Sequence, residues 1–563
     1  MTPIGHGPTR RDWSRLPAAA FHLALAGLVL ALGMILVWNP ILGAHDFWAH
    51  AGVGRWITEN GRVPDRSLFL WTADEPWVYH SWLTQLLFYN LTRISTPETL
   101  ARVVLGFTTF FALTPFVLAW WVWGLRARFT CVMALPFVVA LDAIGHRFQP
   151  RPELFTAFFL SLLLVYLTRR ADPPGPDRPT RSTRRRIVEA GVVLGLFSIW
   201  ANLHGAVVIG VQVFFVTAVG DFLQNRRDGH WKFPAVLAIL APIAVCVNPY
   251  GPTYWLALRP VGSYRFSTIV EWFPVWRNPD QPEAVIIAAV LLPALATLAW
   301  VLNPERRWAQ LGWLVMFATM YVLARRNIWP FAIVCLMMLA ANARSLDLES
   351  IWSRLSRMIN RRAKSLPPPA FLRWALRVFV MLWLLLHAWP VFADFRPWTK
   401  YTPTRLEKGI VRFVGEQQLE GRVFNDYENS SYFQWRFAGR PSLYIDLLNA
   451  YPDQVGTDYL EIAQCTDHGL VLLDEQRIGF VILTTNRGPW LSLGKLADYL
   501  DASPGWARVY MGGDGVVWVR RTTEYEHVWR AFNGSVQKTR FRTLERWGDE
   551  GAMIWPAAPG QDP

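Results

Sequence analysis

The chain has 563 residues, of which 52% are hydrophobic and 17% charged, and its mean hydropathy is +0.19. This charged content is well below that of an average soluble domain, which excludes a purely water-soluble globule. The formal net charge of +14 comes largely from arginine-rich segments between apolar runs, a distribution that indicates membrane topology and not nucleic-acid binding. The four cysteines show neither disulfide-framework nor zinc-site spacing.

The N-terminus has a basic flank followed by an apolar run, Leu16 to Trp38, that is too long for a cleaved signal peptide. We therefore expect residues 1–16 to be cytoplasmic and residues 17–393 to form a helical transmembrane domain. Its apolar segments lie near 17–43, 99–124, 129–145, 153–168, 187–201, 205–224, 233–248, 284–302, 309–324, 328–342 and 373–393. This pattern predicts a polytopic membrane protein with about 11–13 spans.

Basic connectors set the predicted orientation. The richest are 169–186 and 344–373. The positive-inside rule places them, and the N-terminus, in the cytoplasm, so that the chain is expected to be a multi-pass membrane protein. The outward connectors are then 44–98, 146–152, 249–283 and the turn at Arg325. In the first of these, residues 79–94 either lie at the outer interface or form a short span.

The chain changes character after Asp394. The stretches RVFNDYENSSYFQW, PSLYIDLL, IGFVILTT and ARVYMGGDGVVWVRR are typical of short strands, and TRLEKGIVRFVGEQQ and LGKLADYLDAS are typical of helices. We expect residues 394–521 to form an extracytoplasmic α/β domain, with a hairpin turn in MGGDGVVW. Residues 522–563 are expected to be a polar tail.

Asp46 is the first candidate for chemistry, because it follows the first apolar segment where a bilayer ends. A carboxylate there could take a proton from an acceptor hydroxyl. Asp46 and His50 are four residues apart and would share a helix face. The alternative is that Asp46 only caps the helix that follows.

Two groups of arginines occur in outward connectors, where the positive-inside bias disfavours them. They are Arg147 and Arg151 in GHRFQPRPEL, and Arg325 and Arg326 in ARRNIWP. Guanidinium groups bind phosphate in bidentate fashion, so a lipid-linked phosphate or pyrophosphate is one expected partner. Lipid headgroups, Glu153 and Asp142 are the alternatives.

Other polar and aromatic residues in outward segments could line a sugar pocket or could cap and break helices. They are His45, Trp48, His50, His80, Asn202, His204, Asn248, Tyr250 and Glu271. A metal site formed by His45, Asp46, His50 and His204 is conceivable, but no recognised ligand spacing supports it. The residues thus indicate no particular cofactor, although a divalent metal ion could be used.

Several of these motifs resemble one family. The run from His45 to Tyr89 resembles the first extracytoplasmic loop of bacterial GT-C glycosyltransferases, which include protein mannosyltransferase-like and aminoarabinose transferase-like branches. FQPRPELFTAFFLSLLLVYL, WANLHGAVVIGV and VNPYG are similar to segments of uncharacterised members, and VFNDYENSSYFQWRF with PSLYIDLLNAYPD resembles their extracytoplasmic domain.

The resemblance implies a GT-C bundle in a bacterial inner membrane and an inverting glycosyltransferase that uses a polyprenyl-phosphate-linked sugar donor. Asp46 matches the catalytic acidic residue that follows the first membrane helix, and Arg147, Arg151, Arg325 or Arg326 would bind the donor phosphate. The loop has HD without an adjacent acidic pair, which argues against protein O-mannosylation. The acceptor would be a hydroxyl of a cell-envelope glycan, lipid or protein.

Three alternatives remain open at this point. An O-antigen-type polysaccharide ligase uses a related bundle and a lipid-pyrophosphate donor. A lipid-linked-sugar transporter would be expected to show paired hydrophobic halves, and none is visible in the sequence. A non-catalytic membrane scaffold could keep the bundle without the activity.

Overall fold

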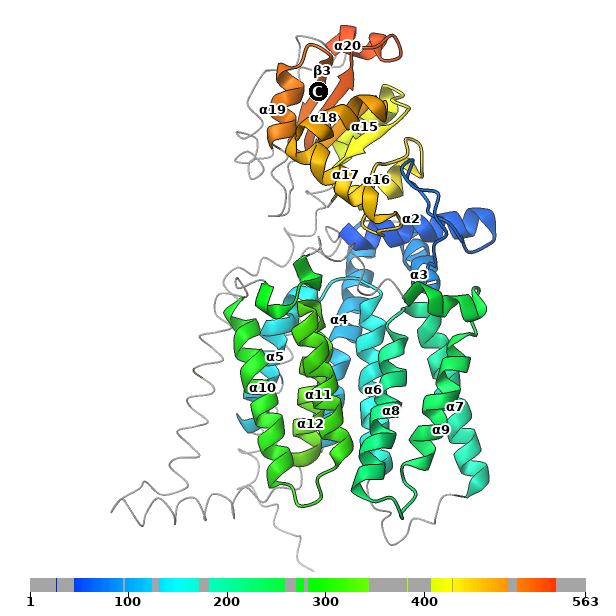
Figure 1. Cartoon of the computed structure of the whole chain (residues 1–563), viewed down its shortest axis with the longest axis vertical. Helices are drawn as coiled ribbons and strands as arrows, with labels where there is room; N and C mark the ends of the chain where they lie inside the picture. Colours follow the sequence, from blue (N-terminus) through cyan, green and yellow to red (C-terminus); the bar gives the residue numbers. More distant parts are fainter. Residues whose placement is uncertain are drawn as a thin grey trace, which may run out of the picture.

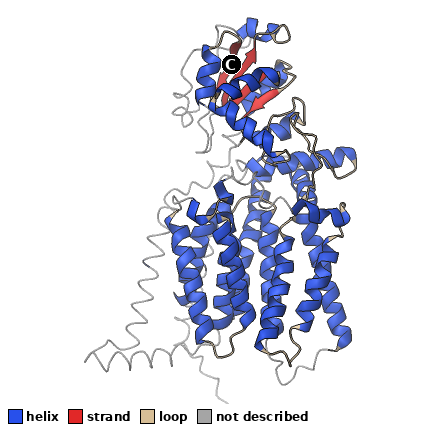
Figure 2. Ribbon diagram, in the orientation of Figure 1, coloured by secondary structure: helices blue, strands red, loops and turns tan. Residues whose placement is uncertain are grey.

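The structure is a computed structural model that describes residues 45–94, 97–123, 131–171, 182–258, 270–277, 282–343, 407–427, 429–484 and 494–532, with Gly27 and Leu382. Long helices form a bundle, and two short helices, α2 and α3, lie at one end of it (Figure 1). A C-terminal part with a small sheet lies beyond these two helices (Figure 2).

The described bundle helices coincide with the nine apolar segments predicted between residues 99 and 342. They are α4 (Pro97–Trp123), α5 (Cys131–Ile144), α6 (Glu153–Ala171), α7 (Thr183–Leu203), α8 (Val207–Gln224), α9 (Lys232–Val245), α10 (Glu283–Leu302), α11 (Trp308–Leu323) and α12 (Ile328–Ala343). Six are long and apolar enough to cross a membrane, and α5, α9 and α11 are shorter apolar helices. The prediction of a mainly helical, multi-pass membrane protein is confirmed; segments 17–43 and 373–393 lie almost wholly outside the described residues.

Packing within the bundle separates a central helix from helices that face outward. Every residue of α12 is buried, because α4, α5, α6, α10 and α11 pack around it. By contrast, α7 exposes Ile187, Val188, Val192 and Ile199. Large aliphatic side chains exposed along a whole helix face are expected to contact lipid.

The segment after Asp46 forms α2 (His45–Asn60), and α3 (Trp82–Thr92) packs beside it. Gly54 allows this close approach, because a Cβ atom at that position would lie 2.0 Å from the backbone oxygen of Gln85. Both helices lie at the end of the bundle (Figure 1). Whether residues 79–94 lie at the outer interface or form a short span stays a prediction.

The C-terminal part has a four-stranded sheet in the order β1-β2-β4-β3. Its strands are β1 (Val423–Asn425), β2 (Phe480–Thr484), β3 (Trp506–Gly512) and β4 (Gly515–Arg520), and its helices are α15 (Lys408–Glu416), α16 (Ser430–Phe437), α17 (Asp453–Gln464), α18 (Asp467–Glu475), α19 (Gly494–Ala502) and α20 (Glu526–Phe532). β1 pairs in parallel with β2, and the other two pairings are antiparallel. The predicted hairpin in MGGDGVVW is confirmed as the β3–β4 turn, and packing continues beyond Arg521 through α20.

Two local predictions in this part were wrong. SSYFQW is the helix α16, not a strand, because its aromatic side chains pack against α2, where Trp48 contacts Tyr432 and Trp435 at ring-centroid distances of 5.7 and 5.9 Å. PSLYIDLL forms no regular strand, and only an isolated bridge joins Leu443 to Leu70.

That bridge attaches the first loop to the C-terminal part. Leu443 N donates to Phe69 O at 2.7 Å, and Trp71 N donates to Leu443 O at 3.1 Å. The Trp71 indole N–H also donates to Val423 O at 3.0 Å. The loop between α2 and α3 therefore fixes β1, and the residues that follow it, relative to the end of the bundle.

Candidate active site

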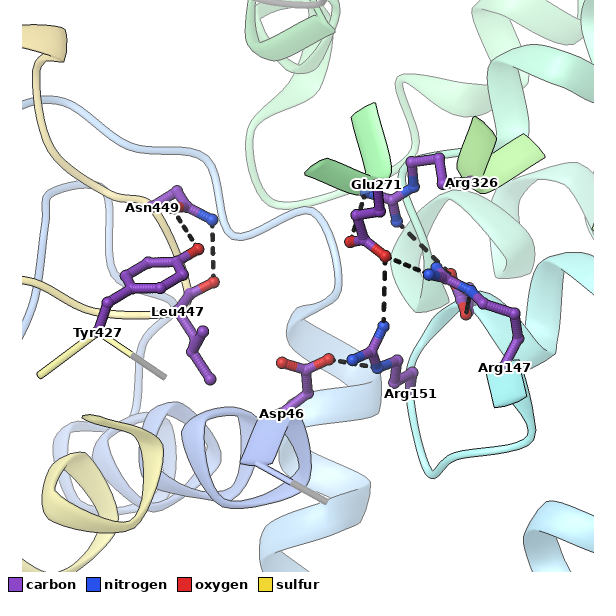
Figure 3. A network of polar contacts seen from close by, with 9 residues as sticks. Asp46, Arg147, Arg151, Glu271, Arg326, Tyr427, Leu447 and Asn449 are labelled. Carbon is purple, nitrogen blue, oxygen red and sulfur yellow. Dashed lines mark hydrogen bonds and ion pairs between the residues drawn. The ribbon is translucent and has the colours of Figure 1, made fainter. Parts of the chain in front are cut away.

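Asp46 lies in the first turn of α2, with its carboxylate turned toward the bundle (Figure 3). Its Oδ2 contacts Nε of Arg151, which lies just before α6. No contact from a backbone N–H to the Asp46 side chain is found among the described residues. The geometry therefore favours an ionic role over the alternative of a helix cap.

Arg147 is held by the acid that begins α6. It lies in the short helix η3 (Gly145–Arg147), and its Nε and Nη2 donate to the two carboxylate oxygens of Glu153 at 3.1 and 2.7 Å. Both side chains are only 7% exposed. Such a two-point pair fixes the planes of both groups, so the alternative that Glu153 is the partner of an outward arginine holds for Arg147.

Glu271 is the acid on which the arginines converge. It lies in the helical turn η6 (Val270–Trp272), and its Oε2 accepts a hydrogen bond from Nη1 of Arg147. Nη1 of Arg151 lies 4.0 Å from the same oxygen, and Nη1 of Arg326 lies 3.6 Å from Oε1. Burial alone would raise the pKa of Glu271, but the three guanidinium groups outweigh it and hold that pKa well below its ordinary value.

Arg326 enters the cluster from the turn η8 (Arg325–Asn327) that precedes α12. Its Nη2 lies 3.5 Å from Oε2 of Glu153, and its guanidinium lies 4.3 Å from the ring centroid of Trp272. Arg325 forms no ion pair with the acids of this cluster within the described residues, and its backbone N–H donates to Phe273 O at 3.0 Å.

Exposure separates the arginines that an incoming anion could reach from the one that it could not. The side chains of Arg151 and Arg326 are 25% and 22% exposed, whereas that of Arg147 is 7% exposed. Burial would lower the pKa of Arg147, but Glu153 and Glu271 outweigh that effect and raise it. Arg151 and Arg326 are therefore the accessible cations. Arg147 is buried, and its ion pairs hold the carboxylates of Glu153 and Glu271 in place.

Three histidines lie around this cluster and are uncharged near neutral pH. Burial lowers the pKa of His50 to about 4, although Asp46 opposes the shift. Burial likewise lowers the pKa of His80 to about 4, and burial together with His80 lowers that of His204 to about 3. Because these histidines are neutral, they can offer hydrogen bonds to a ligand without changing the net charge of the cluster.

The hydrogen bonds of His204 define its tautomer. Thr156 Oγ1 accepts from the Trp200 indole N–H at 2.8 Å and lies 2.7 Å from Nδ1 of His204. No other acceptor for the Thr156 hydroxyl is found in the described part of the chain, so its hydrogen points to Nδ1. His204 then carries its proton on Nε2. His50 Nδ1 similarly lies 3.3 Å from the amide nitrogen of Gln85, which can only donate.

Other pocket candidates use their polar groups inside the fold. Asn202 accepts from the Trp82 indole at 2.7 Å, and Asn248 accepts from Tyr250 N at 2.8 Å. The Tyr250 hydroxyl donates to Pro64 O at 2.7 Å and accepts from Tyr79 N at 3.0 Å. Within the fold, the polar groups of Asn202, Asn248 and Tyr250 thus hold neighbouring segments together.

Trp48 is buried against α16, as described above. The side chains of His45 and His146 lie outside what the structure describes.

The sequence did not single out the residues that face Asp46 from the C-terminal part. Figure 3 shows Tyr427, Leu447 and Asn449 across from Asp46 and Glu271. The Tyr427 hydroxyl donates to Asn449 Oδ1 at 3.0 Å, and Asn449 Nδ2 donates to Leu447 O at 3.1 Å. Burial, aided by Asp46, raises the pKa of Tyr427. Tyr427 is the second residue after β1, and polar residues at strand ends would have been the available signal.

The described side chains around Asp46, which do not include that of His45, are not arranged as a ligand set for a divalent metal ion. Within the described residues, no three His, Cys, Asp or Glu side chains are grouped closely enough to hold one. The three acids of the cluster are each paired with a guanidinium group. We therefore assign no step to a metal.

Comparison with known proteins addresses the fold. No protein-family model matches the chain, and no curated protein is similar to it in sequence. Among solved structures, it is similar to the oligosaccharyltransferase AglB from Archaeoglobus fulgidus in complex with an inhibitory peptide and a dolichol-phosphate. That match has a TM-score of 0.52 and 11% identity, and covers 91% of this chain and 75% of AglB.

The apo form of the A. fulgidus oligosaccharyltransferase matches with a TM-score of 0.51 and 11% identity, over 82% of this chain and 69% of the other. The chain has the GT-C fold. Apo ArnT from Cupriavidus metallidurans, another GT-C enzyme, matches with a TM-score of 0.48 and 13% identity, over 89% of this chain and 98% of ArnT. At these identities the similarity describes the GT-C architecture, and the chemistry of this chain has to be argued from its own residues.

Proposed function

We propose that the protein is an inverting glycosyltransferase that moves a sugar from a polyprenyl-phosphate-linked donor to a hydroxyl group of a cell-envelope acceptor. The observation that carries the proposal is the contact between the Asp46 carboxylate and Arg151, in a cluster where Arg151 and Arg326 remain accessible. The cluster thus combines a proton acceptor with cations for a phosphate, at the end of a GT-C bundle.

In the proposed reaction, the Asp46 carboxylate takes the proton of the acceptor hydroxyl. The hydroxyl oxygen attacks the anomeric carbon of the donor, and the bond from that carbon to the phosphate oxygen breaks. The electron pair of this bond leaves with the polyprenyl phosphate. General-base catalysis of this kind contributes roughly 10²- to 10⁴-fold to a rate.

Arg151 and Arg326 are proposed to bind the phosphate. Its negative charge grows as the glycosidic bond breaks, so guanidinium groups contribute more in the transition state than in the ground state. The A. fulgidus enzyme of the same fold is bound to a dolichol-phosphate, a lipid phosphate of the proposed class. Arg147, which is buried, is proposed to position Glu153 and Glu271.

We place the site at the outer face of a bacterial inner membrane, with the C-terminal part extracytoplasmic. Arg169 and Arg170 at the end of α6, and Arg306 and Arg307 before α11, lie at the bundle end opposite to Asp46. The positive-inside rule assigns that end to the cytoplasm. The arginines at the Asp46 end are an exception that their acidic partners account for.

Mass spectrometry of cell-envelope glycans, lipids and glycoproteins tests the proposal. A strain without the chain is compared with strains restored by the wild type or by Asp46→Asn. A sugar modification that is absent from the deletion and the Asn variant, yet present with the wild type, is expected. An identical set of glycoconjugates in all strains would contradict the proposed function.

A further inference from the structure

Glu271 lies where an external anion would be expected to bind. Arg147, Arg151 and Arg326 come from different elements, yet an Nη atom of each is directed at its carboxylate (Figure 3). Three guanidinium groups around one anion are an arrangement suited to phosphate.

The arginines do not depend on Glu271 for their positions. Arg147 keeps its two-point pair with Glu153, and Arg151 keeps its contact with Asp46. Arg326 keeps both its contact with Glu153 and the ring of Trp272. Removal of the Glu271 carboxylate would therefore leave a preformed cage of cations.

The two acids around Arg147 differ in exposure. The Glu153 side chain is 7% exposed, whereas that of Glu271 is 34% exposed. Rotation of the Glu271 side chain would move its carboxylate into water, but Glu153 would have to leave a buried site. Glu271 is therefore the acid that can exchange with a ligand.

The charges agree with such an exchange. Without Glu271, three guanidinium groups face the two carboxylates of Asp46 and Glu153, which leaves one positive charge. The phosphodiester of a polyprenyl-phosphate sugar carries one negative charge. With Glu271 in place the cluster is already neutral, and an added phosphate would meet an uncompensated carboxylate within a few ångströms.

We propose that Glu271 is a built-in anion that occupies the phosphate site of the donor, and that the donor must displace it in order to bind. This inference rests on the proposed function, because it takes the donor to be a lipid-linked phosphate. Glu271 then lowers the affinity for the donor and keeps the arginine cage closed to weaker anions when no donor is present.

Binding of undecaprenyl phosphate, the leaving group of the proposed reaction, to the purified full-length protein in nanodiscs tests the inference without turnover, because its phosphate would occupy the same site. Glu271→Gln is expected to bind this lipid about tenfold more tightly than the wild type, because the amide cannot compete as an anion. Glu283→Gln removes the same charge from an exposed position in the first turn of α10 and is expected to keep wild-type affinity. Arg326→Ala is expected to bind more weakly than the wild type.

The outcomes separate the inference from the proposed function. Unchanged or weaker binding by Glu271→Gln, with measurable binding by the wild type, would overturn the displacement alone. Absence of binding by the wild type and every variant would overturn the donor class as well. If Glu271→Gln does not fold, Glu271→Ala provides the same test, because it also removes the carboxylate and should also tighten binding.

Discussion

The guanidinium group of Arg151 contacts the carboxylate of Asp46, and this pair joins the two halves of the candidate site. Asp46 belongs to α2, which lies at the end of the bundle, whereas Arg151 lies two residues before the start of the membrane helix α6. The contact places a proton acceptor beside an accessible cation. A sugar phosphate held by that cation would present its anomeric carbon close to an acceptor activated by Asp46.

Replacement of Arg151 tests the phosphate half of the site. A charged hydrogen bond contributes roughly 1.5–3 kcal/mol, so Arg151→Ala is expected to raise the KM for the lipid donor about 10- to 100-fold. Arg151→Lys should recover part of this loss, because the ammonium group restores the charge but cannot form two parallel hydrogen bonds to a phosphate as a guanidinium group does. Steady-state kinetics with varied donor provide the measurement, and an unchanged donor KM in Arg151→Ala would assign that arginine to another partner.

Arg147 and Arg326 should behave differently although both contact Glu153 and Glu271. Arg147→Ala leaves the buried carboxylate of Glu153 without its main partner, so we expect a loss of about 3–5 kcal/mol in stability. Arg326 is more exposed, and Arg326→Ala should chiefly weaken donor binding with a smaller change in Tm. Thermal unfolding in detergent, measured beside donor kinetics, distinguishes the two; equal effects of both variants on Tm would contradict the assignment.

The histidines predict how stability depends on pH. The pKa values of His50 and His80 are lowered to about 4 in the folded state, whereas an unfolded histidine titrates near 6.5. Between these values the unfolded chain binds more protons, so stability falls as pH drops from about 6.5 to 4. His80→Asn should reduce the slope of Tm against pH in that window, and an unaltered slope would show that His80 contributes nothing to it.

Asp446 should act in the opposite direction. It is fully buried and accepts from Gln434 Nε2 at 2.7 Å, and burial raises its pKa to about 7. The folded state therefore binds more protons than the unfolded state between about 4 and 7, so this residue lowers stability as pH rises. Asp446→Asn removes that dependence and should raise Tm above pH 7 relative to the wild type, whereas a lower Tm there would contradict the account.

Gly54 should control the packing of α2 on α3. A Cβ atom in Gly54→Ala would lie 2.0 Å from Gln85 O, and backbone atoms cannot move aside as a flexible side chain could. We expect a loss of roughly 1–3 kcal/mol or more. Gly61→Ala is not a matched control, because Gly61 has a positive φ of 66°, whereas Gly106→Ala in α4 meets no atom within 4 Å and should be tolerated. Similar Tm values for Gly54→Ala and Gly106→Ala would contradict the close approach.

The sequence predicted the bundle helices well because membrane helices are a local property of the chain. Apolar runs and the basic connectors between them are visible without knowledge of the fold, and each described run is a helix. The PSLYIDLL and SSYFQW stretches were assigned to strands because their aromatic and branched residues favour strands. Their structures depend on distant partners, Leu70 and Trp48, which local propensity does not report.

The sequence indicates which residues form the candidate site better than it indicates how they are arranged. Asp46, Arg147, Arg151 and Arg326 are unusual residues for their positions, and that signal is in the sequence. The central position of Glu271 is not, because it depends on three elements meeting at one carboxylate. The same limit applies to Tyr427, which faces the site only because the loop after α2 attaches β1 to the bundle.

The most direct test of the central claim is the rate of sugar transfer by membranes that contain equal amounts of Asp46→Asn and Glu59→Gln protein. Glu59 lies on the same helix, is exposed and pairs with Arg55, so its variant controls for changes to α2. We predict that Glu59→Gln keeps wild-type transfer and that Asp46→Asn loses it by roughly 10²- to 10⁴-fold. Transfer by Asp46→Asn at the wild-type rate would contradict the claim that this carboxylate is the catalytic base.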